Sequence, residues 1–124
     1  RLGLTLRWHQ GSWWQAAPHE PPFDLVLSNP PFVAAGDPHL AALGHEPLAA
    51  LVPQGDRGDG LADIERIVAG AAGRLAPGAW LLLEHGAEQA TAVRDLLRGA
   101  GFAPPQTRTD LAGRERVTGA ACSA

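Results

Sequence analysis

The sequence contains no lysine, no tyrosine and no methionine among its 124 residues, and its one cysteine is Cys122. All ten basic residues are therefore arginines, and they form no run. With a net charge of −3 and an isoelectric point of about 5.9, nothing in the chain argues for binding to nucleic acid or to an anionic membrane surface. A single cysteine excludes a disulfide within the chain and a metal site made of cysteines.

Long apolar runs and metal-binding spacings are also missing. No apolar stretch approaches the ~20 residues of a membrane-spanning helix, so we expect no membrane partner. The five histidines show neither the HxH nor the HExxH spacing, so we expect no metal site. No signal peptide is visible at Arg1, which predicts a cytoplasmic protein. Because the chain does not open on methionine, we expect it to belong to a longer reading frame or to have been processed.

Apolar residues make up 45% of the chain and charged residues 19%, a balance that permits one globular domain over residues 1–124. Apolar spacing and the positions of proline and glycine predict an alternation of strands and helices. The expected strands are 4–10, 23–29, 79–86, 102–110 and 115–122, and the expected helices are 60–78 and 87–101.

This alternation is typical of an α/β fold with a mostly parallel sheet. Leu25, Val26 and Leu27 run without a polar residue between them, which favours a central strand covered on both faces. The prolines at 104 and 105 favour an edge strand at 102–110. The last two strands are joined by the short segment DLAGR, which suits an antiparallel hairpin. The proline- and glycine-rich segment between residues 32 and 59 predicts a long functional or disordered loop.

The segment FDLVLSNPPFV, residues 23–33, ends an apolar strand on a rigid polar corner. Asn29 has a side-chain carbonyl acceptor, and Pro30 has a carbonyl with no N–H beside it. Two acceptors on one rigid corner can bind both hydrogens of a planar –NH2 group, while Phe32 offers a flat face for stacking. The alternative interpretation is that Pro30 and Pro31 simply end the strand and that Phe32 is a core residue.

FDLVLSNPPF resembles motif IV of the amino-group methyltransferases that use S-adenosylmethionine. Further segments resemble, in order and spacing, the release-factor glutamine methyltransferases of the HemK/PrmC family. These are DPHL (37–40), HEPLAAL (45–51), GDGLADI (58–64), LLLEHGAEQ (81–89) and DLAGRERVT (110–118). The resemblance covers nearly the whole chain. It implies a partial Rossmann-like class I methyltransferase sheet, S-adenosylmethionine as the cofactor and a peptide chain release factor as the protein substrate.

The resemblance also implies roles for single residues. Asn29, Pro30, Pro31 and Phe32 match the catalytic motif that binds the substrate amide, and Asn29 also lies by the cofactor. Trp13 matches an aromatic residue beside the cofactor's adenine; the alternative is that one of the neighbouring tryptophans 13 and 14 is core and the other covers a loop.

Three further positions carry weaker expectations. Glu46 matches a substrate-site turn, with a solvated surface carboxylate as the alternative. Glu84 and His85 end a strand on the same side as the NPPF corner. A glutamate–histidine pair can do acid–base chemistry, but here we expect it to pack the strand end, because no base is needed before the methyl transfer.

One motif of the family has no counterpart in this sequence. No GxGxG turn follows a strand, and the carboxylate that would bind the ribose is missing with it. The chain therefore resembles the C-terminal part of the catalytic domain, with strands 3 to 7 of the order 3-2-1-4-5-7-6. Two strands would be absent between 4–10 and 23–29. We expect either that 4–10 moves across to pair with 23–29, or that two chains pair through the exposed edge as a homodimer.

A different amino-group substrate, such as a glutamine of a ribosomal protein or a nucleobase, is the enzymatic alternative. The non-enzymatic alternative is a truncated remnant that folds without binding the cofactor.

Overall fold

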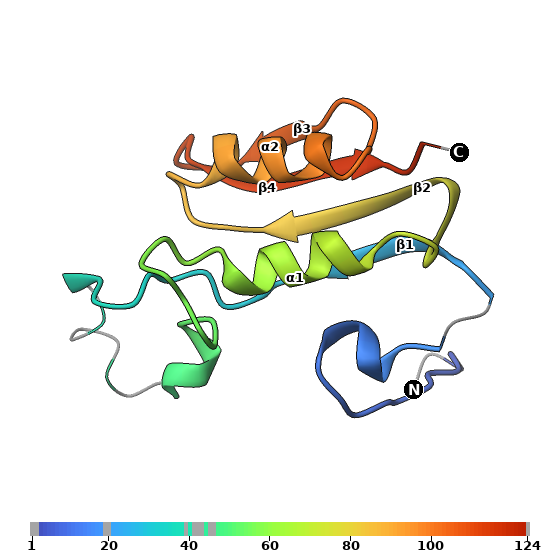
Figure 1. The fold of residues 1–124 in the computed structure, drawn as a ribbon, viewed down its shortest axis with the longest axis horizontal. Helices are drawn as coiled ribbons and strands as arrows, with labels where there is room; N and C mark the ends of the chain where they lie inside the picture. The colour runs from blue at the N-terminus through green and yellow to red at the C-terminus, as the bar shows by residue number, and fades with distance from the viewer. Residues whose placement is uncertain (1–2, 19–20, 39, 41–43, 45–46, 124) are drawn as a thin grey trace.

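Four strands pair into one sheet in the order β1-β2-β4-β3 (Figure 1). They are β1 (Phe23–Ser28), β2 (Leu75–Glu84), β3 (Gln106–Thr109) and β4 (Glu115–Ala121). The computed structural model describes residues 3–18, 21–38, 40, 44 and 47–123. β1 and β2 are parallel, whereas β4 is antiparallel to both of its neighbours. The order matches strands 4-5-7-6 of the expected sheet, and the C-terminal antiparallel hairpin is confirmed.

The strand expected at residues 4–10 is wrong, because residues 3–10 form no strand. The alternating apolar side chains of this segment remain mainly exposed: Leu4, Leu6 and Trp8 are 74%, 67% and 85% exposed. The move of this segment onto β1 therefore does not occur. Without this strand, the parallel part of the described sheet is a single pair, so the expectation of a mostly parallel sheet is also wrong.

Two helices cover one face of the sheet, α1 (Ala62–Gly70) in front of β1 and α2 (Ala90–Gly99) in front of β4 (Figure 1). The hydrophobic core lies between these helices and the sheet. Its fully buried large members are Ile64, Leu81, Leu83, Val93 and Leu97. Because strand side chains alternate between faces, Leu81 and Leu83 point toward the helices and Leu82 points to the opposite face.

No helix covers the opposite, bare face of the sheet in the part of the chain that the structure describes. Leu25 and Leu27 are 54% and 67% exposed there, and they pair in register with Trp80 and Leu82 of β2. The expectation that residues 25–27 form a strand covered on both faces is therefore wrong for this chain. The apolar run is present, but one of its two covering layers is not.

The predicted helix at 60–78 is shorter than expected, and the following strand starts earlier. A turn at residues 71–74 ends α1, with Gly73 at a φ of 77°. β2 then begins at Leu75 and passes through Pro77 and Gly78, which lie at the end of the range expected for the helix. The ladder tolerates this because its register shifts between Phe23 and Leu25, where an irregularity leaves room for extra residues.

Candidate active site

The corner Asn29–Phe32 follows the carboxyl end of β1, where ligands of open α/β sheets bind. Asn29 is exposed, whereas Pro30 is one of the fully buried residues. Alternation along the strand explains the difference: Pro30 continues the helix-covered face and Asn29 the bare face. Within the described part of the chain, no residue bonds to the Asn29 side chain or to the Pro30 carbonyl. Both predicted acceptors are thus without a described partner, but only Asn29 is exposed to a ligand in this structure, since Pro30 is fully buried.

An open cleft of about 1000 Å³ lies beside this corner and brings together segments that are far apart in the sequence. It is lined by Asn29 and Pro31, by the 310-helix η1 (Trp13–Ala16) with the turn before it, by Asp63 of α1, and by a stretch of the long loop that includes the 310-helix η3 (Leu48–Ala50). These residues are Gly11, Ser12, Trp13, Asn29, Pro31, Leu48, Ala50, Val52, Pro53, Gln54 and Asp63. Trp13 and Asn29, the two residues expected to contact the cofactor, therefore share one cleft.

Trp13 is held in an unusual backbone conformation by a bond across the cleft wall. Its φ is 48°, a left-handed value that is rare for a bulky residue. The indole Nε1–H donates to Oδ1 of Asp63 over 3.0 Å, and Arg66 donates to the same oxygen over 2.6 Å. Asp63 is 5% exposed and lies in the first turn of α1, where the helix dipole favours a negative charge. The Trp13 ring is 37% exposed and available to a ligand.

Trp14 has a different environment from its neighbour. Its Nε1–H donates to the Ile67 carbonyl over 2.7 Å, and its ring packs 6.4 Å from the ring of Phe23. A side chain at Gly70 would collide with this ring, so the glycine late in α1 makes room for it. Trp14 is thus a packing residue, while Trp13 faces the cleft.

Phe32 is half-buried and packs against the hydrophobic core. Its carbonyl accepts a hydrogen bond from Nε2 of Gln89, just before α2, over 2.9 Å. The same nitrogen donates to the Asp59 carbonyl over 2.8 Å, and Oε1 of Gln89 accepts from the Gly86 N–H over 2.7 Å. The backbone of the corner is therefore tied to two other loops.

Asp56 organises the loop before α1. Its carboxylate accepts from the backbone N–H groups of Ala35, Gly58 and Gly60 at 2.6–2.9 Å. Burial alone would raise the pKa of Asp56, but these hydrogen bonds favour the charged form more strongly and the pKa lies below its usual value. This carboxylate fixes the loop against the segment that follows the corner.

Glu84 and His85 do not form a pair. Alternation puts Glu84 on the bare face and His85 on the helix-covered face, where His85 is fully buried. His85 Nε2 lies 2.7 Å from the Thr118 hydroxyl, and Nδ1 lies 2.8 Å from the Gly86 carbonyl. Burial lowers the pKa of His85, so the ring is neutral at neutral pH. This arrangement fits the structural role expected for this strand end.

One residue predicted for the site cannot be placed, and three residues near the corner were not assigned a role from the sequence. Glu46 lies outside the described residues. The sequence interpretation missed Asp63 and Asp56, and it quoted Gln89 only as part of a motif. The sequence signal for Asp63 was its position in the first turn of the expected helix, after the GDG segment.

In the described part of the chain, no three histidine, cysteine or acidic residues are grouped so that they could hold a metal ion. No helix there is long and apolar enough to cross a membrane.

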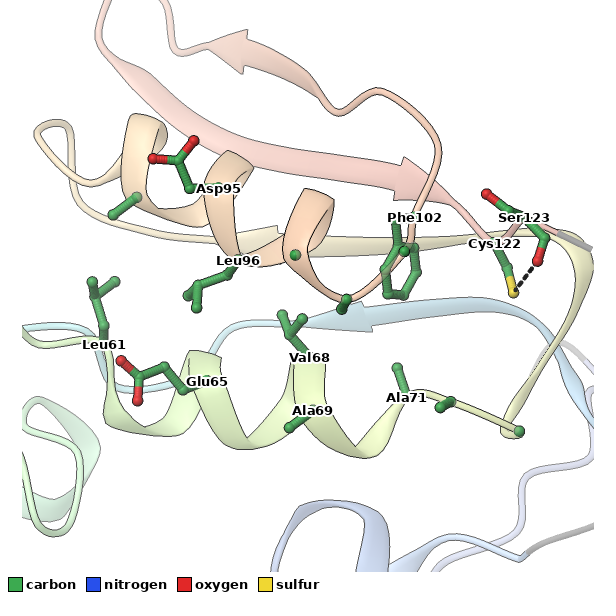
Figure 2. Close-up of a pocket in the computed structure, with 16 residues that line it drawn as sticks. Leu61, Glu65, Val68, Ala69, Ala71, Asp95, Leu96, Phe102, Cys122 and Ser123 are labelled. Atoms are coloured by element: carbon green, nitrogen blue, oxygen red, sulfur yellow. Dashed lines mark hydrogen bonds between the residues drawn. The ribbon is translucent and has the colours of Figure 1, made fainter.

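A second groove of about 930 Å³ lies away from the corner, between α1, α2 and the C-terminal residues (Figure 2). Leu96, Val68 and Phe102 project into it, and Cys122 lies at its far end (Figure 2). Its walls are mainly apolar, and Glu65 and Asp95 are its charged side chains. It contains none of the residues that the corner brings together.

Comparison with protein-family models finds no match. Comparison with curated proteins finds the release factor glutamine methyltransferase of Bordetella pertussis, 48% identical over 121 residues, which cover 96% of this chain and 44% of that protein. That of Burkholderia pseudomallei is 50% identical over 121 residues, covering 96% of this chain and 41% of that protein. This chain thus spans less than half the length of these relatives.

Among solved structures, a similar one is the crystal structure of a release factor-specific protein-(glutamine-N5) methyltransferase from Alicyclobacillus acidocaldarius. The TM-score is 0.53 and the identity 26%, over 86% of this chain and 52% of that chain. The sheet order and the Asn-Pro-Pro-Phe corner at the end of β1 place the fold in the class I methyltransferases. Within that class, nearly the whole chain is similar to part of the release factor glutamine methyltransferases.

Proposed function

We propose that this chain carries the substrate-binding part of an enzyme that methylates the side-chain amide nitrogen of a glutamine in a peptide chain release factor. The observation that carries the proposal is the exposed Asn29 side chain at the end of β1, which has no hydrogen-bond partner among the described residues and shares a cleft with Trp13. The names of the curated relatives supply the substrate and the reaction.

The chain's own residues position the amide. Asn29 Oδ1 and the Pro30 carbonyl accept the two N–H groups of the substrate, which fixes the plane of the amide and the direction in which its nitrogen faces. Pro31 keeps the corner rigid, and Phe32 stacks on the amide. Such preorganisation contributes most where reactants must be aligned, as in a transfer between two bound molecules. Glu46 keeps the substrate-site role that the resemblance implies.

S-adenosylmethionine, when bound, supplies an electrophilic methyl group. The residues present fit part of this cofactor: the cleft has the volume of a small-molecule site, and the exposed ring of Trp13 gives adenine a stacking surface. Trp13 and Asn29 are few contacts for so large a ligand. Because this sequence has no glycine-rich turn, we expect the remaining contacts to come from residues outside this chain. A release factor is a cytoplasmic substrate, so we place the activity in the cytoplasm.

The proposal is tested in a chimera in which this chain replaces the corresponding part of the Bordetella pertussis relative. Purified release factor and S-adenosylmethionine labelled in the methyl group are the substrates. We expect label in the glutamine of the release factor and none in a release factor with that glutamine replaced by alanine. A folded chimera that binds the cofactor and transfers no label would reject the proposal. Label on ribosomal protein or nucleic acid instead would assign a different amino group.

A further inference from the structure

The side-chain amide of Gln89 joins three loops at the carboxyl edge of the sheet. Its Nε2 donates one hydrogen to the Phe32 carbonyl and the other to the Asp59 carbonyl, at 2.9 and 2.8 Å. Its Oε1 accepts from the Gly86 N–H at 2.7 Å. Both donors and the acceptor of one amide are therefore used, each by a different loop, and only a neutral amide of this length offers that combination.

The backbone packs closely around the side chain of Gln89 at two glycines. Gly60 has a φ of 74°, and a side chain there would collide with the Phe32 carbonyl and lie 2.8 Å from Gln89 Nε2. A side chain at Gly86 would lie 3.1 Å from Gln89 Oε1. Two of the three loops thus have a glycine next to the Gln89 amide. The Phe32 carbonyl lies between Gly60 and Gln89, which restricts the backbone at the end of the corner.

A partly buried chain of hydrogen bonds leads from Arg94 to His85, which contacts the Gly86 carbonyl. Arg94 can only donate, and it reaches the Thr107 hydroxyl over 2.8 Å; that hydroxyl lies 2.8 Å from the Thr118 hydroxyl, which lies 2.7 Å from His85 Nε2. The Gly86 carbonyl can only accept, so the neutral ring of His85 carries its proton on Nδ1. Each hydroxyl then donates toward His85. Gly86 is consequently fixed at its carbonyl by His85 and at its N–H by Gln89.

We propose that Gln89 is a positioning residue for methyl transfer: its amide sets the backbone of Asn29–Phe32, and hence the direction of the acceptors that hold the substrate amide. This inference rests on the proposed function. Gln89 touches neither substrate nor cofactor; it acts through the Phe32 carbonyl.

Two substitutions separate the contacts of Gln89. Gln89→Glu keeps the acceptor for Gly86 N–H but loses both donors and places a negative charge against two carbonyl oxygens. Gln89→Met keeps the length and loses all three hydrogen bonds. Gln106→Glu, in the edge strand β3, is the matched exposed control. Val93→Ala, in the buried face of α2, is the control for a general loss of stability that leaves the Gln89 amide in place.

The first arm of the experiment uses this chain alone and needs no activity. NMR follows the carbonyl carbons of Phe32 and Asp59 and the hydrogen exchange of the Gly86 N–H. We expect both carbonyl resonances to shift in Gln89→Glu and in Gln89→Met, while the Gly86 N–H loses protection only in Gln89→Met. Carbonyl resonances that stay at their wild-type positions in both variants would overturn the inference.

The second arm measures methyl transfer in the chimera described above. We expect both Gln89 variants to lower kcat by about 100-fold while the Kd for S-adenosylmethionine rises far less, because Trp13 and the rest of the cofactor site lie outside the displaced corner and only Asn29 belongs to it. Val93→Ala should lower the unfolding temperature and leave kcat unchanged, a split that a merely structural role of Gln89 would not produce. Wild-type kcat in both Gln89 variants would overturn the inference, whereas an inactive unsubstituted chimera would instead overturn the proposed function.

Discussion

The indole nitrogen of Trp13 lies 3.0 Å from Oδ1 of Asp63, and this bond joins the segment before β1 to the first turn of α1. The two residues are 50 positions apart in the sequence. The bond occupies the polar edge of the indole and leaves its ring at the wall of the cleft that contains Asn29. The ring is thus oriented by a buried carboxylate, which offsets the cost of a left-handed backbone at a bulky residue.

Replacement of Trp13 by alanine should weaken the binding of S-adenosylmethionine to the chimera by about tenfold or more, because stacking on an aromatic face is lost. Trp13→Phe should keep much of the affinity, since it keeps a ring face and loses the donor to Asp63. Calorimetric titration measures both. Trp8→Ala, at an 85% exposed tryptophan outside the cleft, is the control. Equal affinities of Trp13→Ala and Trp8→Ala would remove Trp13 from the cofactor site.

Gly60→Ala should lower the free energy of unfolding by about 2 kcal/mol or more, because alanine is strained at its φ of 74° and its methyl group would displace the Phe32 carbonyl. Gly99→Ala is the matched control, since it lies at the end of α2 with open space around it. That change should stabilise the chain by up to about 1 kcal/mol. Urea denaturation compares the two, and similar effects of both substitutions would contradict the geometry of the corner.

Stability should fall as the pH is lowered from about 6.5, the ordinary pKa of histidine, toward the lower pKa of buried His85. In this window the unfolded chain binds a proton at His85 that the folded chain does not bind. Above pH 6.5 both states are neutral and the effect vanishes. Unfolding temperatures between pH 7.5 and 5 should show this slope in wild type and in His9→Gln, and a smaller slope in His85→Gln. An unchanged slope in His85→Gln would assign the dependence to other groups.

The isolated chain should form a two-fold dimer through its uncovered β1 strand, because β1 is an edge of the described sheet and Leu25 and Leu27 are exposed beside it. The double substitution Leu25→Asp and Leu27→Asp should give a monomer. Leu111→Asp, in the exposed hairpin turn, should leave the dimer intact. Sedimentation equilibrium measures the mass of each, and a monomeric wild-type chain at millimolar concentration would show the prediction to be wrong.

Local signals in the sequence predicted the elements that have their packing partners within this chain. β1, α2 and the β3–β4 hairpin were expected near their observed ranges, because Pro, Gly and apolar spacing mark them. Residues 4–10 alternate between apolar and polar as a strand does. Alternation shows which side chains would be buried, but a strand forms only where other elements pair with it and cover that face. β2 passes through Pro77 and Gly78 because a register shift beside β1 accommodates them, which is a property of the pair and not of either strand.

The candidate site also combines a local motif, which the sequence predicts, with distant partners, which it does not. Asn29–Phe32 could be predicted as the site from the sequence, because the proposed chemistry requires adjacent residues. The partners of the Phe32 carbonyl are 28 and 57 positions away, since Gly60 lies against it and Gln89 donates to it. Nothing local distinguishes these residues from an exposed glutamine and an ordinary turn glycine. Their roles depend on the sheet bringing three loop ends together.

The most direct test of the account is the methyl-transfer rate of Asn29→Ala in the chimera. Asn29 is exposed and makes no side-chain hydrogen bond within the described residues, so its loss should leave the unfolding temperature unchanged. The control is Gln54→Ala, an exposed polar residue of the same cleft, which should transfer at the wild-type rate. The account predicts that kcat falls by about 100-fold or more in Asn29→Ala, because one of two acceptors that align the amide is gone. Transfer within about tenfold of wild type would contradict it.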